Sequence, residues 1–217
     1  MRSMKQRAMG SEDKAARRAD ILAAARALYR QNSYQLPSVA QIATASGLAK
    51  GTVYLYFRTK EEIFVALLAE DFTGLLNEVE RHFSTPSSAG SLDAFLSDYM
   101  AYLKHHPELL RLDAMAYSVL EQNLDIEQMR AFKLGLTQQL VATGAIIERA
   151  FALPEGRGTS LLMRTYALTR GLWQTLDYPP CMSELLAAPE FAPIRPPFLT
   201  ELPQALAEYW RGALQAP

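Results

Sequence analysis

Apolar residues recur every three or four positions along most of this chain, a spacing that predicts amphipathic α-helices. Polar runs, glycine and proline separate these stretches, and no alternating strand pattern or internal repeat is present. The sequence therefore predicts an all-α protein. The expected long helices cover 11–31, 60–82, 91–105, 107–120, 125–151, 157–177 and a last stretch from 200 onward. Residues 178–197 are rich in proline, and we expect them to be irregular with at most one short helix.

Two much shorter helices are predicted between residues 38 and 57. Ser38 and Gln41 have the spacing of a capping box, which starts a helix. Gly47 can adopt the left-handed backbone conformation that ends this helix, and a second helix opens at Lys50. The result is a helix, a tight turn and a helix. We expect the preceding helix at 11–31 to pack over the pair and complete a three-helix domain.

This arrangement is typical of DNA-binding proteins, which place the second helix in the major groove with its first residues at the base edges. Lys50 can reach a phosphate or a guanine, and Gly51 allows a close approach of the backbone. Thr52 can hydrogen-bond a base or touch a thymine methyl group. The further candidates for DNA contact, mainly to phosphates, are Ser38, Tyr54, Tyr56 and Lys60.

The string from Ile42 to Glu61 reads I-A-x-x-x-G-L-x-K-G-T-V-Y-x-Y-F-x-x-K-E. It resembles the N-terminal domain of the tetracycline-repressor (TetR) family of transcriptional regulators. The resemblance implies an N-terminal helix-turn-helix domain followed by a helical regulatory and dimerisation domain. Ala49 departs from the family pattern, which usually has Ser or Thr capping the second helix. An alanine there loses a cap worth about 1 kcal/mol.

The distribution of charge agrees with a DNA-binding N-terminal part. Lys and Arg outnumber Asp and Glu by 8 in residues 1–60, whereas the rest of the chain carries an excess of 9 acidic residues, giving a net charge of −1. A basic surface is what phosphate binding requires. We therefore expect a DNA-binding domain over 1–58, with 1–10 as a mobile basic arm, and a regulatory domain over 59–217.

The C-terminal part is expected to hold a dimer interface. The helix at 157–177 is apolar on two sides, so one side needs a second surface. In the TetR family the last two helices of each subunit form a four-helix interface, and the stripes here fit that role. The candidate interface residues are Leu161, Leu168, Leu172, Leu206, Tyr209 and Trp210.

The resemblance also implies an effector. Family members typically bind a small, often apolar ligand in the C-terminal domain and then release DNA. The candidate ligand-binding residues are Met100, Arg111, Met115, Phe132, Leu136, Tyr166, Arg170 and Trp173. We expect a homodimeric repressor that leaves a palindromic operator when a small molecule binds. The alternative is a DNA-binding protein of the same fold that senses no small molecule and responds to a protein partner or acts architecturally.

Other classes of function find little support in the sequence. No paired carboxylates, nucleophile–histidine constellation or cofactor loop is present, so we expect no enzyme and no cofactor. His105 and His106 are adjacent and diverge on a helix, and no second ligand pair is spaced nearby, so we expect no metal site. Cys181, the single cysteine, excludes an internal disulfide. Without a membrane span or a signal peptide in the sequence, we expect a cytoplasmic protein.

Overall fold

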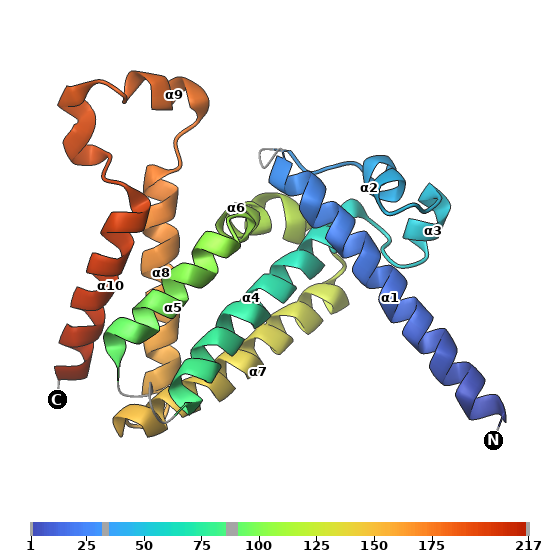
Figure 1. Cartoon of the computed structure of the whole chain (residues 1–217), viewed down its shortest axis with the longest axis horizontal. Helices are drawn as coiled ribbons and strands as arrows, with labels where there is room; N and C mark the ends of the chain where they lie inside the picture. The colour runs from blue at the N-terminus through green and yellow to red at the C-terminus, as the bar shows by residue number, and fades with distance from the viewer. Residues whose placement is uncertain (1, 32–34, 86–90, 216–217) are drawn as a thin grey trace. The chain divides into compact units, whose positions relative to one another are not determined.

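The computed structural model describes residues 2–31, 35–85 and 91–215, and every regular element in these ranges is helical (Figure 1). This confirms the all-α prediction. None of the described helices is long and apolar enough to cross a membrane. The α-helices are α1 (Arg2–Gln31), α2 (Val39–Ala45), α3 (Lys50–Tyr54), α4 (Lys60–Ser84), α5 (Leu92–His105), α6 (Glu108–Met115), α7 (Ile126–Phe151), α8 (Arg157–Leu176), α9 (Pro180–Leu185) and α10 (Phe198–Gln215). The remaining elements are a π-helical turn, η1 (Ala116–Leu120), and two 3₁₀ helices, η2 (Glu121–Asn123) and η3 (Pro189–Ile194).

Side-chain caps start several of these helices where the sequence predicted them. The Ser91 hydroxyl accepts a hydrogen bond from the Ala94 amide at the start of α5. At the start of α7 the Gln128 amide donates to Asp125 Oδ1 at 2.9 Å, and the Asp125 amide donates to the Gln128 side chain. Each cap satisfies a backbone donor that the first turn of a helix leaves without a partner.

Three elements differ from the sequence-based expectation. Helix α1 begins at Arg2 rather than at Ser11, so residues 2–10 extend the helix; Met1 lies outside the described residues. This segment contains neither proline nor a β-branched residue, so nothing local stops the helix. After α6 the helical backbone widens into the π-helical turn η1 and then tightens into the 3₁₀ helix η2. The proline-rich segment contains both α9 and η3.

The chain forms two compact units. Unit 1 contains residues 1–70 and 111–130, and unit 2 contains residues 71–110 and 131–217. The boundary between the two units lies inside α4, α6 and α7. In unit 1 the completely buried residues Ile21 and Tyr29 of α1 share a core with Ile42, Val53 and Phe64. The Tyr29 and Phe64 rings lie 5.7 Å apart, which fixes α1 on the start of α4.

Unit 2 has its own core, built largely from aromatic rings. Trp210 of α10 is completely buried and packs edge-on against Phe95 of α5, with 5.1 Å between the ring centroids. The rings of Phe83 and Phe151 lie within 6.4 Å of the indole as well. Figure 1 shows α8 and α10 running side by side, joined by the segment that contains α9. These contacts make α10 an integral part of the unit.

Candidate DNA-binding helix-turn-helix

The segment from Ser38 to Phe57 folds as two short helices joined by a tight turn. The Gln41 amide donates to Ser38 Oγ, and the Ser38 amide donates to Gln41 Oε1 at 2.9 Å, so the predicted capping box is formed. Gly47 has a φ of +68°, and the Leu48 amide bonds back to the Ala43 carbonyl at 2.9 Å. The glycine is required because side chains rarely tolerate this conformation. Helix α3 then starts at Lys50.

Helix α3 has no side-chain cap at its N-terminus. Ala49 occupies the capping position in an extended conformation, and its side chain offers no acceptor. The Thr52 amide bonds to the Ala49 carbonyl at 2.9 Å, and the N–H groups of Lys50 and Gly51 precede it in the first turn without a capping hydroxyl. Such N–H groups are suited to hydrogen-bond an anion.

The two short helices separate an apolar inner side from a polar outer side. Ile42 and Val53 are completely buried, and Phe57 is nearly so beneath the guanidinium of Arg18. Lys50 and Gly51 are exposed on the opposite side. The core thus fixes the backbone of α3, while its first residues remain accessible from outside.

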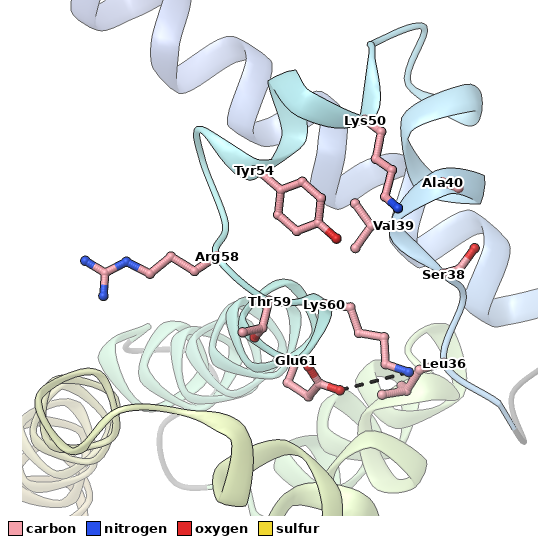
Figure 2. A pocket seen from close by; sticks show the side chains of 10 residues that line it. All are labelled: Leu36, Ser38, Val39, Ala40, Lys50, Tyr54, Arg58, Thr59, Lys60 and Glu61. Carbon is pink, nitrogen blue, oxygen red and sulfur yellow. Dashed lines mark ion pairs between the residues drawn. The ribbon is translucent and has the colours of Figure 1, made fainter.

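An open hollow of about 470 Å³ lies between α3, the start of α2 and the start of α4 (Figure 2). Lys50 and Tyr54 reach it from α3, and Lys60 lines it from α4. Its lining residues are Leu36, Ser38, Val39, Ala40, Lys50, Tyr54, Arg58, Thr59, Lys60 and Glu61. Three cations and one carboxylate therefore surround the hollow, which makes it electropositive.

The three cationic side chains of the hollow have different interaction partners. Lys50 Nζ lies 6.0 Å from the centre of the Tyr54 ring, and Lys60 Nζ lies 3.9 Å from a Glu61 oxygen. Arg58 points away from the hollow in Figure 2, and its guanidinium lies 3.3 Å from Asp125. The Arg58 side chain is 78% exposed. Exposed pairs of this kind contribute little to stability, so these cations can exchange partners at small cost.

The structure gathers four of the seven predicted DNA-contacting residues around this hollow: Ser38, Lys50, Tyr54 and Lys60. Gly51 is exposed beside it on α3, whereas Thr52 and Tyr56 are half-buried. Arg58 is a basic residue of this surface that the sequence analysis did not single out. Arg58 directly follows Tyr56 and Phe57 at the end of the helix-turn-helix, and this position could have identified it as a candidate for phosphate contact.

Three of the predicted dimer-interface residues lie in the interior of unit 2. Leu161, Leu206 and Trp210 are completely buried within unit 2, so they offer no surface to a partner chain. The apolar stripes that contain them pack against each other and against α5. Leu168, Leu172 and Tyr209 are half-buried at the same helices.

The eight predicted ligand-binding residues are all partly exposed, but they do not belong to one unit. Arg111 and Met115 lie in unit 1, where the Tyr29 hydroxyl donates to the Met115 sulfur at 3.7 Å. The other six lie in unit 2, and the Tyr166 ring packs edge-on against Phe72 with centroids 5.2 Å apart. The members in unit 2 are Met100, Phe132, Leu136, Tyr166, Arg170 and Trp173.

The capped helix α2, the glycine turn and helix α3, with a buried inner side and a basic outer side, form a helix-turn-helix of the kind that DNA-binding proteins use. Residues 21–67 match the model of the bacterial regulatory proteins of the tetR family. Residues 69–217 match the tetracycline repressor-like C-terminal domain. Together these matches cover most of the chain. The protein belongs to the TetR family of bacterial regulatory proteins.

Two curated relatives match part of the chain. The fatty acid metabolism regulator protein of Bacillus subtilis (strain 168) is 33% identical over 69 residues, which are 32% of this chain and 36% of that protein. The HTH-type transcriptional regulator YfiR of the same organism is 28% identical over 87 residues, 40% of this chain and 42% of its own. The chain thus spans well under half the length of either relative.

Solved structures show the same fold. A TetR-family regulator from Streptomyces coelicolor superposes with a TM-score of 0.54 at 16% identity, covering 91% of this chain and 99% of the other. FadR from Bacillus subtilis, solved in complex with stearoyl-CoA, superposes with a TM-score of 0.53 at 20% identity, covering 88% and 95%. At these identities the likeness concerns the fold alone.

Proposed function

We propose that this regulator reads its operator with the first turn of α3 and holds the flanking phosphates with the basic residues around the hollow. The observation that carries the proposal is the electropositive hollow bounded by Lys50 and Lys60 beside the uncapped N-terminus of α3. Thr52 is the residue of α3 that supplies base discrimination. Lys60, Arg58 and Ser38 position the protein along the backbone, which carries no sequence information directly.

Substitution of Thr52 and Lys60 separates these two roles. Thr52→Ala weakens binding to the operator by about 1–3 kcal/mol and leaves binding to random DNA unchanged. Lys60→Ala weakens binding to both DNAs alike and reduces the slope of log affinity against log salt by about 1. Fluorescence anisotropy at several salt concentrations measures both. Equal losses of Thr52→Ala on operator and random DNA would remove Thr52 from the base contacts.

The proposal includes a homodimer on a palindromic operator. Two α3 helices related by a twofold axis read two half-sites about 34–36 Å apart, one turn of the duplex. The outward faces of α8 and α10 are the surfaces we assign to the partner chain, flanked by half-buried Leu168 and Tyr209. Exposed Met163 supplies apolar area on this face of α8.

We further propose that the protein is a repressor released by a small ligand with an apolar part. The stearoyl-CoA complex of FadR and the fatty acid metabolism regulator among the relatives support this class of effector. Helix α4 is continuous from Lys60 to Ser84 and contributes residues to both units, so it is a covalent route from an effector to the helix-turn-helix. A hundredfold loss of operator affinity requires about 2.8 kcal/mol of coupling.

Titration of the operator complex with stearoyl-CoA tests the effector class. We expect operator affinity to fall by at least tenfold when the ligand is in excess, and the same ligand to raise the melting temperature of the free protein. The matched ligand control is coenzyme A without the acyl chain, which should do neither. A ligand that raises the melting temperature yet leaves operator affinity unchanged would contradict release by the effector.

A further inference from the structure

Three potential metal ligands meet inside unit 2, away from the helix-turn-helix. Asp71 belongs to α4, His106 follows the last residue of α5, and Glu108 is the first residue of α6. His106 Nδ1 lies 3.5 Å from Asp71 Oδ1 and 3.9 Å from Glu108 Oε1. One ligand atom from each residue lies within 4.8 Å of the other two. We propose that these side chains bind one divalent transition-metal ion, with Zn²⁺ as the first choice.

The distances suit such an ion with little rearrangement. Tetrahedral Zn²⁺ with bonds of about 2.0–2.1 Å to nitrogen and oxygen holds its ligand atoms about 3.3 Å apart. The separations from His106 Nδ1 to the two carboxylates, 3.5 and 3.9 Å, exceed this value by less than 1 Å. Small rotations of the carboxylates would close the remaining distance.

Burial and orientation also favour a built site. Asp71 and Glu108 are each 1% exposed, which is unusual for carboxylates, while the His106 side chain is 30% exposed and opens the cluster to solvent. The Tyr102 ring stacks on the His106 ring with centroids 4.1 Å apart, and the Tyr102 hydroxyl donates to the Asp71 main-chain oxygen at 2.8 Å. Tyr102 thereby holds the imidazole and the backbone of Asp71 in fixed relation.

The donor set indicates which ions bind. One imidazole nitrogen with two carboxylate oxygens matches Zn²⁺, Mn²⁺ or Fe²⁺ better than Mg²⁺ or Ca²⁺, which prefer oxygen alone. Three protein ligands leave a fourth position for water.

Sequence spacing could not indicate this site. The adjacent residues His105 and His106 look like a pair of metal ligands in the sequence. The His105 ring, however, bonds to the Ala101 carbonyl of its own helix at 2.6 Å. The ligands that accompany His106 are Glu108, two residues later, and Asp71, which only the packing of α4 against the α5–α6 junction brings near. The proposal does not depend on the proposed operator contacts or on the effector.

The test is zinc binding to the full-length protein after removal of metal with EDTA. Isothermal titration calorimetry with Zn²⁺ should give one ion per chain at micromolar affinity or better, and excess Zn²⁺ should raise the melting temperature by about 5 °C. His106→Gln and Glu108→Gln should each weaken binding at least tenfold. Exposed His105 is the matched control, and His105→Gln should bind like the wild type.

A second readout guards against a folding defect in the variants. The metal-free melting temperature of His105→Gln should agree with that of the wild type, and the Co²⁺-loaded wild type and His105→Gln should show visible absorption bands that His106→Gln, folded by circular dichroism, lacks. Binding that survives His106→Gln unchanged, equal losses in His105→Gln, or no binding by the wild type up to 100-fold excess Zn²⁺ would each overturn the proposal.

Discussion

At the scale of the residue, the interior of unit 2 depends on a short chain of hydrogen bonds beneath the aromatic core. Trp210 Nε1 donates to Thr165 Oγ1 at 2.9 Å, and that hydroxyl donates to the Leu161 carbonyl. Thr169 Oγ1 donates to the Thr165 carbonyl, so it is the acceptor for the Tyr99 hydroxyl at 3.1 Å. These bonds satisfy polar groups that burial would otherwise penalise.

Because Trp210 lies in this interior, its substitution should affect folding. Trp210→Ala leaves a large cavity and removes the hydrogen bond to Thr165, and we expect the free energy of unfolding to fall by about 3–5 kcal/mol. Urea denaturation measures the change, and Leu199→Ala, at an exposed site of the same helix, should alter it by less than about 0.5 kcal/mol. A stable Trp210→Ala protein that has merely become monomeric would restore Trp210 to the dimer interface.

Tyr99 predicts a dependence of stability on alkaline pH. Burial raises the pKa of the Tyr99 hydroxyl well above its ordinary value of 10, because the phenolate would lose its hydration. In the unfolded chain this group ionises first, so its contribution to stability is intact below about pH 10 and declines above it.

Tyr99→Phe should remove this contribution, because phenylalanine has no proton to lose. We expect the free energy of unfolding of the wild type to fall more steeply between pH 9 and pH 11 than that of Tyr99→Phe. Other tyrosines and lysines titrate in both proteins, so the difference between the two slopes is the quantity to measure. Parallel slopes would show that Tyr99 is accessible in the folded state.

At the scale of the element, the sequence predicted the residues that cap helices. It did not predict which neighbouring helix packs against each side of a helix. The boxes at Ser38 and Asp125 depend on residues three positions apart, and both are formed. The two apolar sides of α8 were also visible, but periodicity does not say which neighbour covers a side. Trp210 of α10 and Tyr99 of α5 hydrogen-bond to Thr165 and Thr169 on the side of α8 that contains Leu161, so this side is covered within unit 2.

The contact between α7 and α8 provides a test of packing. A Cβ atom on Gly158 would overlap the Gly144 backbone oxygen, and the Gly158 amide donates to Glu148 Oε1 at 2.9 Å. Neither backbone can yield easily, so we expect Gly158→Ala to lower the free energy of unfolding by about 1–3 kcal/mol. Gly135, in open space on α7, is the matched control.

Gly135→Ala should leave stability unchanged or raise it by up to about 1 kcal/mol, because alanine is the better helix former. Thermal and urea unfolding of the two variants under the same conditions give the comparison. If both substitutions had the same effect, close approach of the two helices would not explain the glycine at 158.

At the scale of the whole molecule, the sequence predicted a basic N-terminal part and a larger acidic remainder, and it did not indicate that residues 111–130 pack with the N-terminal part. Residues 111–130 join unit 1 through contacts between distant parts of the chain. Arg58 lies 3.3 Å from Asp125, and the Gln128 side chain donates to Glu62 at 2.8 Å. No local pattern reveals such pairs. The family resemblance, by contrast, depends on a local string, and the family models confirmed it.

The most direct test of the central claim, two α3 helices reading one duplex, is selection of bound sequences from a random DNA pool by the purified protein at low ionic strength. We expect the recovered sequences to share a dyad-symmetric motif with half-site centres about 10 base pairs apart, and sedimentation to show an even number of chains per duplex. Raising the salt should weaken binding steeply. Recovered sequences without a common motif, or a single chain bound to a single half-site, would contradict the account.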